Sequence, residues 1–249
     1  MCTLYHNNHN NHNNPFSLII KYKNDRSVIV NSKYNNLTMN RGVKLFNDLS
    51  KFILTTSSKY KIDETHDISH SMNVLHYAHH IYKHEVRIHP HIVEHVNIIY
   101  ISATLHDMCD NKYMDESEGL KNIIEFLDTK ITEEETDAIS SIISTMSYSK
   151  IKEHGFPELG EYQKAYHIVR EADLLSGYDF DRCIIYDMKV NNKSFEDAFY
   201  RAEELFKTRV FTHFDDGLFT TRYALTQHTV LHNQAIERIQ NWKNILNID

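Results

Sequence analysis

Glycine and proline are scarce in this sequence, with 6 and 3 residues among 249. An architecture of many strands joined by tight turns needs more of both, so the scarcity favours helices. Long hydrophobic runs are also lacking: no apolar stretch approaches the ~20 residues that span a bilayer, and no charged-then-apolar signal opens the chain. We therefore expect a mainly helical protein that is not inserted in a membrane.

The sequence also has few cysteines and no excess of positive charge. The three cysteines, Cys2, Cys109 and Cys183, are odd in number and widely spaced, which favours a reducing, cytoplasmic location without disulfides. With 27 Lys and Arg against 34 Asp and Glu, the net charge is −7. Proteins that bind nucleic acid normally carry a basic stripe, so such binding is not expected. A small phosphorylated substrate remains compatible, because a metal and a few basic side chains can reverse the local charge.

Two regions are distinguished by their patterns. Residues 1–38 hold an Asn/His-rich tract of low complexity, followed by two β-branched runs, 17–22 and 27–30, that predict a small β-hairpin. Residues 39–249 show helical periodicity without a Pro, Gly or Ser linker and predict one all-α domain. The predicted helices cover roughly 40–58, 66–84, 90–108, 116–128, 132–147, 158–175, 178–190, 194–209 and 220–247.

Ionisable residues close or interrupt several apolar segments. His106 and Asp107 end the apolar run 98–105, and burying such a pair costs several kcal/mol unless the two groups are paired or bind a metal. His70 and Asp173 each lie within an apolar segment of their own. Four ligands of this kind can hold one divalent cation and leave coordination positions free for water and substrate.

The order His70, His106-Asp107, Asp173 resembles the H…HD…D pattern of the HD-domain metal-dependent phosphohydrolases. The resemblance covers about residues 60–190 and implies an all-α HD-domain helical bundle with a metal held by these four residues. The segments 106–113 (His-Asp-x-x-Asp-x-Lys-Tyr) and 147–149 (Ser-Tyr-Ser) resemble those of small, single-domain members, some of which are nucleotide pyrophosphatases. The implied activity is hydrolysis of a phosphoric ester or anhydride, and the implied partner is a small phosphorylated substrate, most plausibly a nucleotide.

Chemistry suggests a role for each residue near this pattern. Two neutral imidazoles and two carboxylates suit one Mn²⁺, Fe²⁺, Ni²⁺, Co²⁺ or Zn²⁺ per chain better than Mg²⁺. Asp110 follows His106 by one helical turn, so we expect it to position or deprotonate the attacking water. Lys112 is the expected phosphate contact. His66 is expected to hydrogen-bond a leaving oxygen or to orient Asp67.

Other interpretations remain open at this stage. A non-hydrolytic HD-fold protein that binds metal or nucleotide would keep the ligands without turnover, and a di-iron oxygenase would need further histidines such as His154 or His167. Many relatives have a histidine where this chain has Met146, which weakens a two-metal interpretation. Asp110-Asn111 stands where the guanosine-tetraphosphate hydrolases have a glutamate-aspartate pair, which disfavours that specificity. Phosphate release and pyrophosphate release are equally compatible with the pattern.

Overall fold

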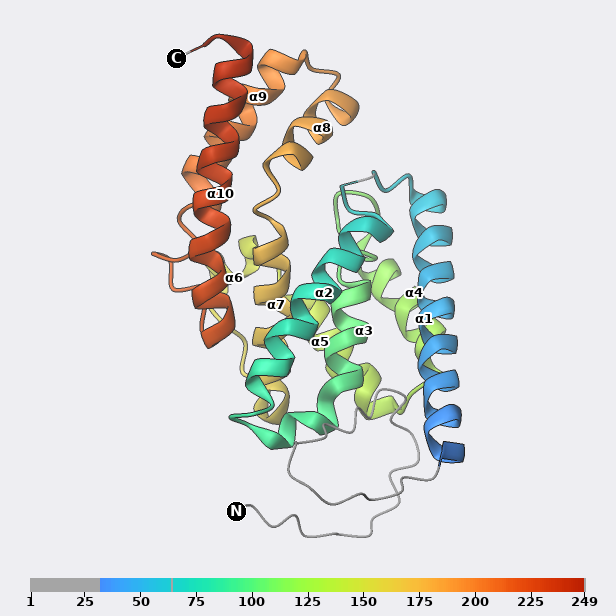
Figure 1. Ribbon diagram of the computed structural model, residues 1–249. Coiled ribbons are helices and arrows are strands. Elements are labelled where there is room, and N and C mark those ends of the chain that lie inside the picture. Colours follow the sequence, from blue (N-terminus) through green and yellow to red (C-terminus); the bar gives the residue numbers. More distant parts are fainter. Residues whose placement is uncertain (1–31, 64, 249) are drawn as a thin grey trace.

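The fold is described by a computed structural model for residues 32–63 and 65–248. Every regular element in these ranges is helical, as the composition predicted (Figure 1). The α-helices are α1 (Ser32–Tyr60), α2 (Ile68–Glu85), α3 (Val96–Leu105), α4 (Glu116–Leu127), α5 (Glu133–Thr145), α6 (Tyr148–His154), α7 (Gln163–Ser176), α8 (Phe180–Val190), α9 (Phe195–Leu205) and α10 (Arg222–Leu246). The Asn/His tract and the predicted β-hairpin lie outside the described residues.

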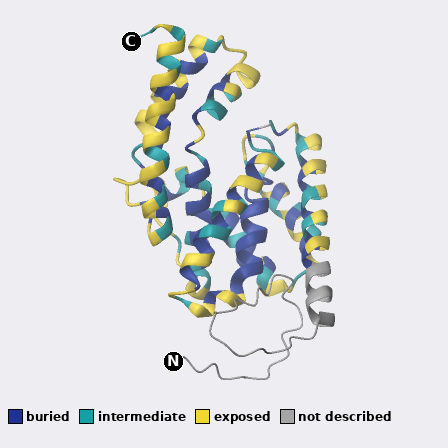
Figure 2. Ribbon diagram, viewed as in Figure 1, coloured by how far each residue is buried: buried dark blue, intermediate teal, exposed yellow. Residues whose placement is uncertain are grey.

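Helix α3 is the centre of the core. All ten of its residues are buried, and it packs against α2, α5 and α7 (Figure 2). Its polar members are small or hydrogen-bonded: the Thr104 hydroxyl, for instance, donates to the Tyr100 carbonyl at 2.6 Å. A helix that is apolar all round is stable only when other helices surround it, and α1 and α4 cover the side of the core away from α10 (Figure 1).

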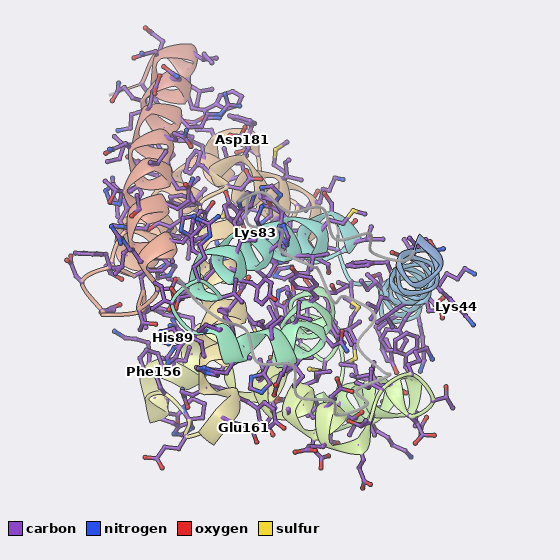
Figure 3. All side chains as sticks on the ribbon, turned by 60° about the horizontal axis from the view of Figure 1, so that its bottom comes forward. Lys44, Lys83, His89, Phe156, Glu161 and Asp181 are labelled. Atoms are coloured by element: carbon purple, nitrogen blue, oxygen red, sulfur yellow. The ribbon has the colours of Figure 1, made fainter. Side chains whose placement is uncertain are left out.

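Helices α8, α9 and α10 form a second layer beside this core. Lys44 on α1 and Asp181 on α8 lie on different sides of the central helices (Figure 3). The chain entering α10 is fixed to α7 by Glu171, which is fully buried and accepts hydrogen bonds from the backbone N–H and hydroxyl of Thr220 and Thr221 at 2.6–3.0 Å. The neighbouring guanidinium of Arg170 lies 3.1 Å from Glu171 and compensates its charge.

Several element boundaries differ from the predicted ones. Helix α1 begins at Ser32, so residues 32–38, which the sequence analysis placed in the appendage, are helical. The predicted helix 90–108 is a 3₁₀ segment, Pro90–His95, followed by α3, which ends at Leu105. The short helix α6 was not predicted, and α9 continues into a π-helical turn, η3 (Phe206–Val210). Thr132 and Glu135 form a capping box at the start of α5.

Candidate metal centre

Three central helices place the predicted ligands. The Asp67 carboxylate accepts a hydrogen bond from the Ser69 backbone N–H at 2.8 Å and caps the start of α2, so His70 lies in its first turn, facing the core. His106 and Asp107 follow directly after the end of α3, and Asp173 projects from α7. The core packing of α2, α3 and α7 therefore brings together residues that are distant in the sequence.

Four ligand atoms converge on one point. His70 Nε2 lies 3.2 Å from His106 Nε2, 3.3 Å from Asp107 Oδ2 and 3.3 Å from Asp173 Oδ1. His106 Nε2 lies 3.3 Å from the same Asp107 oxygen and 3.6 Å from the same Asp173 oxygen. Ligands bound to one transition-metal ion at ~2.0–2.2 Å must lie roughly 3 to 3.5 Å apart at adjacent positions. The group of His70, His106 and Asp173 could hold a metal ion. Asp107 is not part of that group, but its Oδ2 lies 3.3 Å from both histidine nitrogens and is a candidate fourth ligand.

The Nε2 atom of His106 is suited to metal binding. His106 Nδ1 lies 3.0 Å from the carbonyl oxygen of Ala103, which can only accept, so Nδ1 carries a proton and Nε2 is the nitrogen through which His106 can bind a metal. His70 Nδ1 has two neighbours, the Ser176 hydroxyl at 3.4 Å and the Arg182 guanidinium. Because arginine can only donate, binding of a metal at His70 Nε2 requires Arg182 to leave Nδ1, and Ser176 is then the available acceptor.

The charges of this cluster depend on one another. Burial raises the pKa of Asp107 and Asp173, but hydrogen bonds and charge interactions with the two histidines outweigh it and hold both pKa values below the usual range. Burial lowers the pKa of His106, but the two carboxylates raise it overall, whereas burial prevails at His70 and lowers its pKa. The carboxylates are thus anionic, which is the form that binds a cation.

The environment of one buried oxygen, Oδ2 of Asp107, shows whether a metal ion fits this site. Asp107 Oδ2 is buried, and its close polar neighbours are the Nε2 atoms of the two histidines, each at 3.3 Å. When both Nε2 atoms are unprotonated, as metal binding requires, this oxygen has no hydrogen-bond donor among the described residues. An ionised buried oxygen without a donor is costly, and a bound cation would supply the missing partner. The donor set of two imidazole nitrogens and two carboxylate oxygens therefore fits a divalent transition metal.

A cavity of about 620 Å³ opens onto the ligands. His70, Asp107 and Asp173 form part of one wall, which we call the inner wall. The outer wall comes from α8, α9, η3 and the turn that follows, and it includes Arg182, Arg201, Arg209 and His213. The cavity is large enough for a small phosphorylated compound, and basic side chains lie on the side facing the carboxylates.

The other three predicted site residues also line this cavity. Asp110 lies in the turn after α3 and not on a continuing helix as predicted, and its Oδ1 accepts a hydrogen bond from the Lys112 backbone N–H at 2.8 Å. Lys112 Nζ does not pair with Asp110 but lies 4.5 Å from the ring centre of Tyr186 on the outer wall. His66 lines the cavity, and the carboxylate of Asp67 caps α2 through the Ser69 backbone N–H.

The side chains that orient His66 were not predicted from the sequence. The hydroxyls of Thr65 and Tyr113 both donate to the Asp63 carboxylate, and both lie within 3.0 Å of His66 Nδ1. Since each hydroxyl has one proton and gives it to Asp63, His66 Nδ1 must be the donor. Burial raises the pKa of Asp63, but its hydrogen bonds from His66, Thr65 and Tyr113 lower it well below its usual value. His66 therefore presents Nε2 to the cavity.

Other candidates from the sequence lie elsewhere. Cys109 is buried, and burial raises the pKa of its thiol to about 12, which agrees with a packed and unreactive cysteine. His154 is exposed on α6, and His167 packs beside Arg170 and Phe156; neither lines the cavity. The extra histidines that a di-iron site needs are therefore not supplied by these two.

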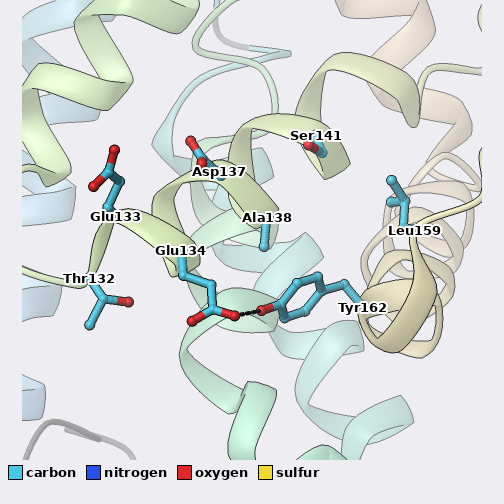
Figure 4. A pocket seen from close by; sticks show the side chains of 8 residues that line it. All are labelled: Thr132, Glu133, Glu134, Asp137, Ala138, Ser141, Leu159 and Tyr162. Atoms are coloured by element: carbon cyan, nitrogen blue, oxygen red, sulfur yellow. Dashed lines mark hydrogen bonds between the residues drawn. The ribbon is translucent and has the colours of Figure 1, made fainter.

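A second hollow lies where α5 begins. It is lined by Thr132, Glu133, Glu134, Asp137, Ala138, Ser141, Leu159 and Tyr162, and the Tyr162 hydroxyl donates to Glu134 at 3.2 Å (Figure 4). It contains three carboxylates, no basic side chain and none of the predicted site residues. An anionic substrate is therefore better served by the cavity at the metal centre.

Comparison with solved structures supports the fold. A crystal structure of a Lactobacillus plantarum protein, determined as a structural genomics target, is similar with a TM-score of 0.59 at 20% identity, covering 82% of this chain and 97% of that chain. No protein-family model and no curated protein matches the sequence. Among the described residues, no helix is both long enough and apolar enough to cross a bilayer.

Proposed function

We propose that this chain is an HD-domain metal-dependent phosphohydrolase acting on a small phosphorylated substrate, most plausibly a nucleotide. The observation that carries the proposal is the convergence of His70, His106, Asp107 and Asp173 at 3.2–3.6 Å, at the base of a cavity that also holds Asp110 and Lys112. One Mn²⁺, Fe²⁺, Ni²⁺, Co²⁺ or Zn²⁺ per chain suits this donor set. A metal bound there would acidify a water molecule and polarise the phosphoryl group.

The remaining side chains would handle protons and charge. The Asp110 carboxylate can accept the proton of the attacking water, because its Oδ1 is held by the Lys112 backbone while its other oxygen remains available. Lys112 Nζ has an aromatic ring and no carboxylate as its described neighbour, so a substrate phosphate can recruit it. His66, fixed through Nδ1, can donate a proton to the leaving oxygen from Nε2 when it is protonated.

Two rival functions make different demands on the same site. A regulatory metal- or nucleotide-binding protein would have no use for a carboxylate at Asp110 beside the ligands. A di-iron oxygenase would need a second set of ligands, and the one metal-binding group found in the described residues is that of His70, His106 and Asp173. Hydrolysis is the proposal that uses every ionisable group described at the base of the cavity.

The test combines metal counting with a substrate panel. Purified protein should contain, or take up, one transition metal per chain by elemental analysis, and should hydrolyse at least one of a panel of nucleotides, sugar phosphates and phosphomonoesters. Metal uptake without turnover across Mn²⁺, Fe²⁺, Co²⁺, Ni²⁺, Zn²⁺ and Mg²⁺ would favour the binding protein. Two irons with consumption of O₂ would favour the oxygenase.

A further inference from the structure

His213 is an unusual histidine of the outer wall. Its side chain lines the cavity and is only 3% exposed, yet neither ring nitrogen has a hydrogen-bond partner in the described part of the chain. The ring packs against aromatic neighbours, with ring centres 5.4 Å from Tyr148 and 6.3 Å from Tyr178 and from Phe219. Buried polar atoms are normally paired, so two unpaired nitrogens beside a cavity indicate a missing partner.

Arg209 supplies a positive charge beside His213. It belongs to the π-helical turn η3, and its guanidinium lies 4.5 Å from the ring centre of the same Tyr148 that contacts His213. The pKa of His213 is lowered to about 4, mainly by burial and also by the charge of Arg209, against an opposing effect of Asp173. His213 is therefore near both Arg209 and the metal ligand Asp173, and it is neutral at pH 7. Single π-helical turns occur frequently at functional sites.

Two basic residues near Arg209 in the sequence form ion pairs with carboxylates. Lys207, two residues earlier in the same turn, lies 2.9 Å from Glu203, and Arg201 on α9 lies 3.3 Å from Asp187. No carboxylate lies within ion-pair distance of Arg209 in the residues that the structure describes. An unpaired arginine and an unpaired histidine thus line the same cavity as the candidate metal ligands.

We infer that Arg209 and His213 form a second anion subsite, which binds a phosphate group of the substrate linked to the one attacked at the metal. The guanidinium would donate paired hydrogen bonds to phosphate oxygens, and one His213 nitrogen would donate a further one. This inference rests on the proposed function and makes it more specific: the outer wall selects compounds with at least two linked phosphate groups over phosphomonoesters.

Binding of inorganic anions tests the inference without relying on turnover. Calorimetry would compare inorganic phosphate with pyrophosphate on the manganese-loaded parent, Arg209→Met, His213→Phe and the matched control Lys207→Met. Because Arg209 is exposed, replacing it with methionine retains the aliphatic part of the side chain and leaves the fold intact. Replacing His213 with phenylalanine preserves the packing of an aromatic ring at that position. Chelation of manganese by pyrophosphate is common to all four proteins and cancels in the comparison.

We expect the parent and Lys207→Met to bind pyrophosphate at least ~10-fold more tightly than phosphate, and each of the other two variants to lose about 10-fold for pyrophosphate alone. Unchanged pyrophosphate affinity in both variants, or equal losses for the two anions, would overturn the subsite while leaving the metal centre intact. Absence of phosphate and pyrophosphate binding in the parent with every metal tried would overturn the subsite and the proposed function together.

Discussion

The inner and outer walls of the cavity differ in how their charges are held. On the inner wall, His70, Asp107 and Asp173 come from, or directly follow, the packed core helices and are fixed by one another at 3.3 Å. On the outer wall, Arg209 is exposed and held only over a tyrosine ring. The comparison indicates that the reacting group of a substrate would be held by the rigid core, and the rest of the substrate by a layer with more freedom.

The largest effect is expected on the inner wall, from Asp107→Ala. Removal of this carboxylate takes away one of the four candidate ligands and the anionic neighbour of both imidazoles, so metal affinity should fall by at least ~10²-fold and activity should be lost. Elemental analysis after dialysis, and the rise in melting temperature on adding Mn²⁺, would measure the change. Asp67→Ala is the control: it removes the cap of α2, at about 1 kcal/mol, and should retain metal. Full metal occupancy in Asp107→Ala would remove Asp107 from the ligand set.

Asp110→Asn separates chemistry from metal binding. Asparagine retains the oxygen that accepts from the Lys112 backbone and loses the proton-accepting charge. We expect normal metal content and melting temperature, with kcat lower by about 10²-fold for the best substrate. Parent-like turnover would show that the water needs no carboxylate base. Loss of metal would instead make Asp110 a ligand or the support of one.

Gly119→Ala tests how the turn behind the inner wall is supported. A Cβ at Gly119 on α4 would lie 2.6 Å from both the Cα and the Cβ of Cys109, in the turn that follows His106 and Asp107. That overlap forces α4 or the turn to shift, so we expect a loss of about 1–3 kcal/mol in the free energy of unfolding. Chemical denaturation would measure it. A parent-like midpoint would show that α4 and the turn are not closely packed.

The last expected effect comes from His213 on the outer wall and changes the free energy of unfolding only at low pH. The pKa of His213 is about 4 in the folded protein, against about 6.5 for an unperturbed histidine, because burial outweighs the charges of Asp173 and Asp216, and Arg209 and Arg170 act with it. Between these values the unfolded chain binds a proton that the folded chain does not, so stability falls as pH falls from ~6.5 to ~4. His213 accounts for at most about 3 kcal/mol of this loss.

His213→Phe should remove that contribution. At pH 7 the variant should be at least as stable as the parent, because it no longer buries two unpaired nitrogens. Between pH 6.5 and 4 its free energy of unfolding should decline less steeply, as denaturant titrations at several pH values would show. Parallel pH profiles would mean that His213 is protonated equally in both states.

The two walls also differ in what the sequence could predict. The all-helical class and most helices were predictable because α3 is apolar and because α2 and α7 repeat apolar residues at helical spacing. Helix α6 has seven residues, too few for a periodicity to emerge, and nothing in Phe206–Val210 signals a π-helical turn. Tertiary packing decides such short elements.

Among the residues of the site, too, some could be predicted from the sequence and others could not. His70, His106, Asp107 and Asp173 were candidates because ionisable residues in apolar segments are conspicuous in a sequence, and the structure brings them together. Tyr113 ends the segment 106–113 that carries the family resemblance, but nothing in the sequence links it to Asp63, 50 residues earlier, or to His66. Arg209 differs from the paired Lys207 only through its three-dimensional neighbours. The roles of these three residues depend on which side chains they contact in the folded protein, and not on their residue type.

The most direct test of the central claim is a titration of metal-free protein with Mn²⁺, followed by the rate of phosphate or pyrophosphate release from a nucleoside triphosphate. The account predicts that the rate rises linearly and reaches a plateau at one equivalent of metal per chain, and that Asp107→Ala remains inactive throughout. Hydrolysis that is independent of metal, or equal in Asp107→Ala and the parent, would contradict it.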